Sequence, residues 1–173
     1  MRNAWIEPGR ATLLGSLLLS VCGLTACAGR PPGPGGRPLP KPTATAKLTD
    51  SSGKQVGLAI FTATDTGTSV GLSVGGLAPG LHGLQVHATG QCAPPDFSSA
   101  GPRLRDLPDL LVQADGSADT TFPLDPALLR PGPSSLLRPE GTAIVVHAEA
   151  GDQSSEPSDG SGDRIACGTI EPD

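Results

Sequence analysis

Aromatic side chains are scarce in this sequence, which has no tyrosine and only three phenylalanines among 173 residues. A hydrophobic core must therefore be packed mainly by Val, Leu, Ile and Ala around Phe61, Phe97 and Phe122. Basic residues are also few, with 12 Lys and Arg against 17 Asp and Glu. They form no patch with interleaved aromatics, so nucleic-acid binding is not expected.

Long helical periodicity and the common catalytic motifs are missing as well. No segment past residue 45 sustains the 3.6-residue spacing of an amphipathic helix. There is no G-x-S-x-G, HExxH, P-loop or paired CxxC motif, and no serine lies beside a histidine and an acid. These absences exclude long-helix folds and give serine hydrolase chemistry no support.

Short apolar or alternating runs bounded by turn residues are present instead, and this pattern is typical of an all-β domain. About eight such runs suit a sandwich or a barrel, because closure removes exposed sheet edges. The runs lie at residues 44–50, 55–65, 68–76, 81–87, 109–113, 117–124, 141–149 and 163–170.

Residues 1–26 are typical of an export signal, with Arg2 and Arg10 before an apolar run too short for a lasting membrane span. The run ends in "LTAC", which resembles the end of bacterial lipoprotein signals and implies cleavage before Cys27 and lipid attachment to its sulfur. The alternative is an ordinary secretory signal with an incidental cysteine. A lipid on Cys27 would anchor the protein to the bacterial membrane, outside the cytoplasm.

Residues 27–42 are rich in proline and glycine and predict a semi-rigid tether. The folded domain is then expected at 43–173, where Cys92 and Cys167 are the only cysteines. A disulfide between them is the simplest interpretation, because the space outside the cytoplasm is oxidising. Such a bond would contribute roughly 4 kcal/mol in the chain-entropy model.

The histidines are the candidate site residues. Gln85 and His87 are two apart in a predicted strand and therefore share a face. His147 ends another strand, and imidazole suits copper or zinc. From these residues alone, a metal site and ordinary hydrogen-bonded strand histidines both remain open.

Two longer motifs resemble copper/zinc superoxide dismutase. Residues 76–92, "GLAPGLHGLQVHATGQC", resemble the family motif GLxPGxHGFHxHxxGxC, and residues 141–170 resemble its last two strands and the loop between them. The resemblance implies an eight-stranded antiparallel Greek-key barrel and a Cys92–Cys167 disulfide. It also implies that His82 braces a loop by hydrogen bonds.

The resemblance implies four copper histidines, of which two remain, His87 and His147. Gln85 stands at the first H-x-H position, and Pro102 stands where the metal-bridging histidine should follow "SAG". Weak copper binding is therefore the cofactor prediction.

The zinc ligands implied by the resemblance are also depleted. The shortened stretch from Gly101 to Leu107 has no histidine and leaves Asp106 as the single zinc-type ligand. Gly151 replaces the aspartate that links the two metals in the family, so zinc is not expected. Arg164 matches the arginine that guides superoxide to copper, although a structural role at the loop base is equally compatible with its position.

Three functions stay open at this point. The chain could be a tethered dismutase homologue with residual copper-dependent activity, or a lipoprotein that binds copper weakly without catalysis. It could also be a metal-free domain kept as a structural or binding module. The sequence does not identify a protein partner.

Overall fold

The computed structural model describes residues 41, 43–125, 128–130, 132–151 and 162–173. The chain divides into two units, Met1–Pro38 and Leu39–Asp173, and every described residue belongs to the second. The predicted export signal, Cys27 and nearly all of the tether lie outside the described residues. None of the helices within the described ranges is long and apolar enough to cross a membrane.

Nine antiparallel strands and one 3-10 turn, Ser98–Ala100 (η1), make up the secondary structure of the described residues. The strands are β1 (Thr43–Asp50), β2 (Gln55–Ala63), β3 (Thr68–Val74), β4 (Gly80–His87), β5 (Arg103–Val112), β6 (Ala118–Leu124), β7 (Ala143–His147), β8 (Arg164–Thr169) and β9 (Glu171–Pro172).

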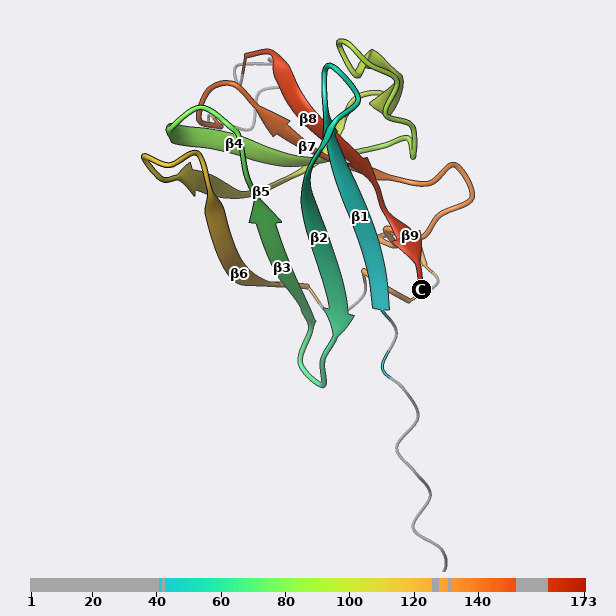
Figure 1. The fold of residues 1–173 in the computed structure, drawn as a ribbon. Coiled ribbons are helices and arrows are strands. Elements are labelled where there is room, and N and C mark those ends of the chain that lie inside the picture. Colours follow the sequence, from blue (N-terminus) through green and yellow to red (C-terminus); the bar gives the residue numbers. More distant parts are fainter. Residues whose placement is uncertain (1–40, 42, 126–127, 131, 152–161) are drawn as a thin grey trace, which may run out of the picture. The chain divides into compact units, whose positions relative to one another are not determined.

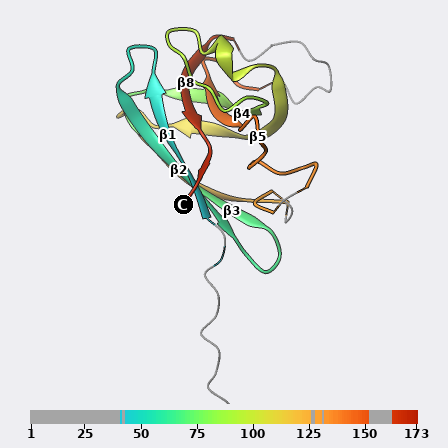
Figure 2. The ribbon, with the colours of Figure 1, turned by 90° about the vertical axis from the view of Figure 1, so that its right-hand side faces the viewer.

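The strands form one sheet that curls into a nearly closed barrel (Figures 1 and 2). Its order is β5-β4-β7-β8-β1-β2-β3-β6, and the short β9 pairs with β1. The end strands β5 and β6 are joined by a tight turn, in which the Gln113 amide donates to the Ser117 carbonyl at 2.8 Å. The pairing of β3 with β6 and of β4 with β7 confirms the predicted Greek-key barrel.

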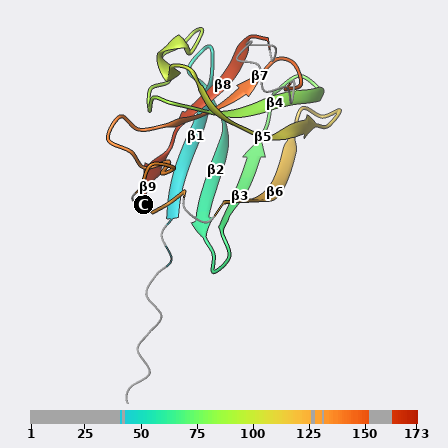
Figure 3. The same ribbon diagram turned by 180° about the vertical axis from the view of Figure 1, so that it is seen from behind.

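Strand β5 is longer than the predicted run at 109–113, because it begins at Arg103. Arg103, Arg105, Asp106 and Pro108 conceal it in the sequence. An end strand tolerates charged side chains and a proline. Its outer edge needs no ladder partner, so a proline there removes no hydrogen bond. In Figure 3, β5 runs along β4 at one border of the sheet.

The barrel interior is almost entirely aliphatic, as predicted. Alternate residues of β1 point inward, so that Ala44, Ala46 and Leu48 are fully buried. Phe61 and Phe122 are the only aromatics in this main cluster among the described residues. The barrel interior is therefore filled mainly by small aliphatic side chains rather than by aromatic rings.

A second, smaller hydrophobic cluster lies under the segment that follows β4. It contains Phe97 and Ala100 from that segment, Ala143 and Val145 from β7, and Cys167 from β8, all with no exposed surface. Cys92 forms a disulfide with Cys167 across 75 residues, which confirms the predicted bond. Disulfide and cluster together fasten residues 92–100 against β7 and β8.

We expect the double variant Cys92→Ser/Cys167→Ser to lose about 2–5 kcal/mol of unfolding free energy, because the unfolded chain regains the entropy of an open loop. Guanidinium denaturation of the full chain measures this loss. The matched variant Cys22→Ser/Cys27→Ser removes two cysteines outside the disulfide and should leave the unfolding free energy unchanged. A loss below about 1 kcal/mol would contradict the stabilising role of the bond.

Candidate functional site

The candidate site lies on the outer face of β4 and β7, where strand alternation places its residues. Gln85 and His87 point outward from β4, while Leu84 and Val86 point into the barrel core. On β7, Val145 is the register partner of Gln85, and His147 ends the strand two residues later. His87 is paired with Ala143, at the start of β7, so the two histidines flank the Gln85–Val145 pair on the outer face and their rings lean towards each other.

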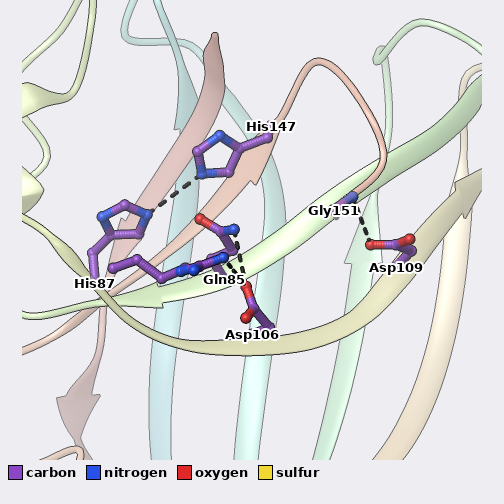
Figure 4. Close-up of polar contacts among 7 residues, drawn as sticks. Gln85, His87, Asp106, Asp109, His147 and Gly151 are labelled. Carbon is purple, nitrogen blue, oxygen red and sulfur yellow. Dashed lines mark hydrogen bonds and ion pairs between the residues drawn. The ribbon is translucent and has the colours of Figure 1, made fainter. Parts of the chain in front are cut away.

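The two predicted copper histidines meet directly (Figure 4). The Nε2 atoms of His87 and His147 are 3.4 Å apart, and their ring centroids are 5.6 Å apart. Both side chains are buried, with 1% and 4% of their surface exposed. A two-ligand metal with bonds of about 2 Å spans up to about 4 Å between nitrogens, so the distance permits one shared ion.

Backbone carbonyls fix the orientation of both rings. His87 Nδ1 lies 2.8 Å from the Gly101 carbonyl oxygen, and His147 Nδ1 lies 3.1 Å from that of Gly162. A carbonyl only accepts, so each Nδ1 bonds its carbonyl as an N–H donor, and the facing Nε2 atoms then hold at most one proton between them. In the neutral ring this leaves Nε2 as the ligating nitrogen, and the Nε2 atoms are the ones that face each other.

Gln85 is turned towards β5. It is 5% exposed, and its Nε2 donates to Asp106 Oδ1 at 3.0 Å. Arg103 donates to the same oxygen from its NH1 atom at 3.2 Å, and this ion pair is partly buried, with side chains 18% and 33% exposed. The carboxylate predicted at the zinc position thus accepts from an amide and a guanidinium.

Sequence reasoning missed Arg103, and the register of β5 explains why. Asp106 pairs with Gln85 and Arg103 pairs with His87, while Leu104 has no partner on β4. Strict alternation would place positions 103 and 106 on opposite faces. Leu104 is the extra residue of a β-bulge, and this bulge returns Arg103 and Asp106 to the same face.

Arg164 is tied to the segment under the disulfide. Its NH1 donates to the Phe97 carbonyl at 2.7 Å, and its NH2 donates to the Gly101 carbonyl at 3.1 Å. Gly101 O therefore accepts from both Arg164 and His87. Gly101 has φ +74°, and a Cβ there would lie 2.8 Å from Thr89 Oγ1, so only glycine places this carbonyl without strain.

His82 connects the start of β4 with the end of β7. Its Nδ1 lies 2.8 Å from the carbonyl oxygen of His147, and its Nε2 lies 2.8 Å from that of Ala78. The side chain is 4% exposed and contacts the backbone of His147 rather than the paired rings.

The segment after β7 crosses β4 over a glycine. The Gly83 amide donates to the Glu149 carbonyl at 2.6 Å, and a Cβ on Gly83 would lie 3.0 Å from the Gly151 nitrogen. Gly151 donates to Asp109 Oδ1 at 3.0 Å (Figure 4). A β5 carboxylate that the sequence analysis did not single out therefore holds the loop where the resemblance places a metal-linking aspartate.

The described residues contain no group of three or more His, Cys, Asp or Glu side chains placed to hold one metal ion. The arrangement brings together His87 and His147 but not Asp106, which is engaged by Gln85 and Arg103. It offers two imidazole nitrogens to an ion and no tetrahedral set.

Residues 55–170 match the family model described as copper/zinc superoxide dismutase. The superoxide dismutase [Cu-Zn] of Caulobacter vibrioides is 34% identical over 148 residues, which is 74% of this chain and 85% of that protein. The superoxide dismutase-like protein YojM of Bacillus subtilis is 31% identical over 186 residues, covering 91% of this chain and 95% of the relative.

Solved structures agree with these matches. A superoxide dismutase-like protein from Bacillus subtilis has TM-score 0.66 and 31% identity, covering 72% of this chain and 96% of its own. A double mutant of that protein, in which histidines replace a tyrosine and a proline, has TM-score 0.67, 32% identity and coverages of 72% and 95%. The Cu/Zn superoxide dismutase of Brucella abortus has TM-score 0.61 and 26% identity, covering 75% of this chain and 99% of its own.

We expect Asp106→Ala to lower the unfolding free energy by about 1–3 kcal/mol, because it removes an acceptor of the buried Gln85 amide and the partner of Arg103. Asp106→Asn should cost less, since its carbonyl oxygen can still accept. Chemical denaturation measures both. The control Asp125→Ala, whose side chain is 76% exposed and 3.7 Å from Arg105, should change little. Equal stability of Asp106→Ala and the unsubstituted chain would contradict this role of Asp106.

Proposed function

Because the chain belongs to the copper/zinc superoxide dismutase family, we propose that it is a member that has lost fast superoxide dismutation while keeping the barrel. In this proposal its copper site is reduced to His87 and His147. The family model covers 55–170, which includes both histidines and every strand from β2 to β8.

The observation that carries the proposal is the position of Gln85. Its side-chain nitrogen donates to Asp106, which Arg103 also engages. An amide nitrogen in this arrangement offers no electron pair to a metal, and the amide oxygen is a harder, weaker donor to copper than the imidazole it stands in for. Pro102 at the bridging position has no ligand atom in its side chain.

Dismutation requires copper to stay bound while it alternates between two oxidation states. Cu(II) favours tetragonal nitrogen coordination, and two imidazoles supply only half of that set. The residues therefore do not fit the full copper site of the family. They fit its zinc site less, because the one carboxylate at the zinc position is engaged in an ion pair.

Weak binding of cuprous copper is the second candidate function, and the distance of 3.4 Å between the His87 and His147 Nε2 atoms favours it. Cu(I) tolerates two nitrogen ligands better than Cu(II) does. Both rings are already oriented through Nδ1, so binding would need little rearrangement. Bound copper would supply redox chemistry in the family, but here the ion would be held without an efficient cycle.

We also propose that the domain is displayed outside the cytoplasm by a lipid on Cys27 and the tether at 27–42. The LTAC motif and the proline-rich composition support this placement. The Cys92–Cys167 disulfide is consistent with an oxidising compartment.

Metal analysis and superoxide removal test the proposed loss of activity. We use the full chain with Cys22→Ser and Cys27→Ser, because their thiols would bind copper elsewhere. We expect this protein to remove superoxide no faster than its His147→Ala variant. Activity that depends on His147 would contradict the proposal.

Restoring the ligands provides the matched gain of function. We expect Gln85→His/Pro102→His to raise Cu(II) affinity by about 10–100-fold or more, since even outer partners of a ligand are worth that much. The Bacillus subtilis double mutant shows that a related barrel accepts two added histidines. The same measurements are made on the chain with its natural Gln85 and Pro102. If that protein retains neither Cu(I) nor Cu(II) and copper does not change its thermal midpoint, the metal-free module remains as its function.

Cell fractionation tests the anchor. We expect the unsubstituted chain to sediment with membranes and Cys27→Ser to be soluble, because the serine cannot accept the lipid. Cys22→Ser is the control, since it removes a cysteine of the same leader but leaves the LTAC site. Soluble wild-type protein would favour the ordinary secretory signal.

A further inference from the structure

We propose that the opening to the histidine pair admits small cations and disfavours anions, and that Asp96 and Asp163 select for the cation. The class of ligand is a soft monovalent metal ion, Cu(I) or its redox-inert analogue Ag(I). This inference rests on the second candidate function, weak cuprous binding at His87 and His147, and adds the residues that control access to it.

A surface hollow borders one ring of the buried pair. It has a volume of about 210 Å³ and is lined by Asp96, Ser98, His147, Gly162, Asp163 and Arg164. His147 is 96% buried and its Nε2 lies 3.4 Å from that of His87, so the hollow contacts the His147 ring, and His147 in turn contacts His87.

A second hollow of about 390 Å³ shares Asp96, Asp163 and Arg164 with the first. The same three charged residues therefore border both depressions. His147 lines the first hollow and not the second, so an ion that approaches it through the first passes the two carboxylates.

Among the described residues that line this opening, acidic groups outnumber basic ones. Asp96 and Asp163 are exposed, whereas Arg164 is partly buried. Arg164 donates to the Phe97 and Gly101 carbonyls. Those bonds commit part of the guanidinium to the loop backbone, while Arg164 also lines the hollow.

Asp96 is held in its charged form. Its Oδ1 accepts from the Ser98 amide and from the Ser98 hydroxyl, each at 3.0 Å. These hydrogen bonds, together with the nearby charge of Arg164, lower the pKa of the Asp96 carboxyl below its ordinary value. The negative charge therefore persists below neutral pH.

A concave surface lined by one sign of charge raises the local concentration of the opposite ion and accelerates its association by about 10–1000-fold at low ionic strength. The described lining carries two carboxylates and one guanidinium, so the excess charge is negative, a metal cation is concentrated and superoxide is repelled. The negative charge of the opening and the presence of Gln85 at a copper-histidine position thus both disfavour turnover of an anion such as superoxide.

Delivery of Cu(I) or Ag(I) to the full chain tests this inference. All proteins carry Cys22→Ser and Cys27→Ser, which remove the free thiols, and the metal is supplied from a chromophoric chelator whose colour reports transfer. We expect Asp96→Asn/Asp163→Asn to take up metal about 10-fold more slowly than the parent at ~0.01 M salt. Asparagine keeps an acceptor for Ser98, so the loop should stay folded.

The matched control is Asp119→Asn/Glu171→Gln, which makes the same change in net charge at exposed residues of β6 and β9. It should take up metal at the parent rate. Near 1 M salt the difference between the parent and Asp96→Asn/Asp163→Asn should vanish, because screening then acts over about 3 Å. Histidine ring NMR signals report whether metal reaches His87 and His147.

The outcomes separate the two proposals. Metal that perturbs both histidines but enters parent and Asp96→Asn/Asp163→Asn at equal rates overturns the cation-selective opening alone. Metal that perturbs neither histidine overturns weak cuprous binding and this inference together. Slower entry in the Asp96→Asn/Asp163→Asn variant, with no change in the control and loss of the effect in salt, supports both.

Discussion

The Gly101 carbonyl is the group on which the geometry of the site depends. It accepts from His87 Nδ1 at 2.8 Å and from Arg164 at 3.1 Å, so it sets the orientation of a ring and of a guanidinium together. Its own position follows from the positive φ of Gly101 and from the cluster around Phe97. The Cys92–Cys167 bond fastens that cluster to β8, and the disulfide therefore supports the site as well as the barrel.

Much of the fold could be predicted because it depends on features that a sequence displays locally. Alternation and turn residues indicated the strands, and two cysteines in the domain indicated the disulfide. The start of β5 could not be predicted, since its charges and Pro108 are tolerated only at the border of a sheet. Whether a strand lies at the end of a sheet depends on the whole topology, and the residues of the strand alone do not reveal it.

The candidate site divides in the same way. His87 and His147 could be paired by resemblance, and their contact at 3.4 Å agrees with that pairing. Arg103 could not be found, because a bulge at Leu104 changes which residues share its face. The bond from Arg103 to Asp106 depends on that same bulge, whereas Gln85 and Asp106 are direct register partners.

The barrel tolerates such changes because the site and the main core lie on opposite faces of β4. Leu84 and Val86 pack inward with the aliphatic cluster, whereas Gln85 and His87 point outward beneath the loops. Glutamine in place of histidine at position 85 therefore alters no packing inside the barrel. What it leaves is a buried polar position, and a buried amide needs hydrogen-bond partners. Asp106 meets that need, and Arg103 balances the charge of the carboxylate. This hydrogen-bonded ion pair explains how the outer face can be satisfied without the four histidines of a complete copper site.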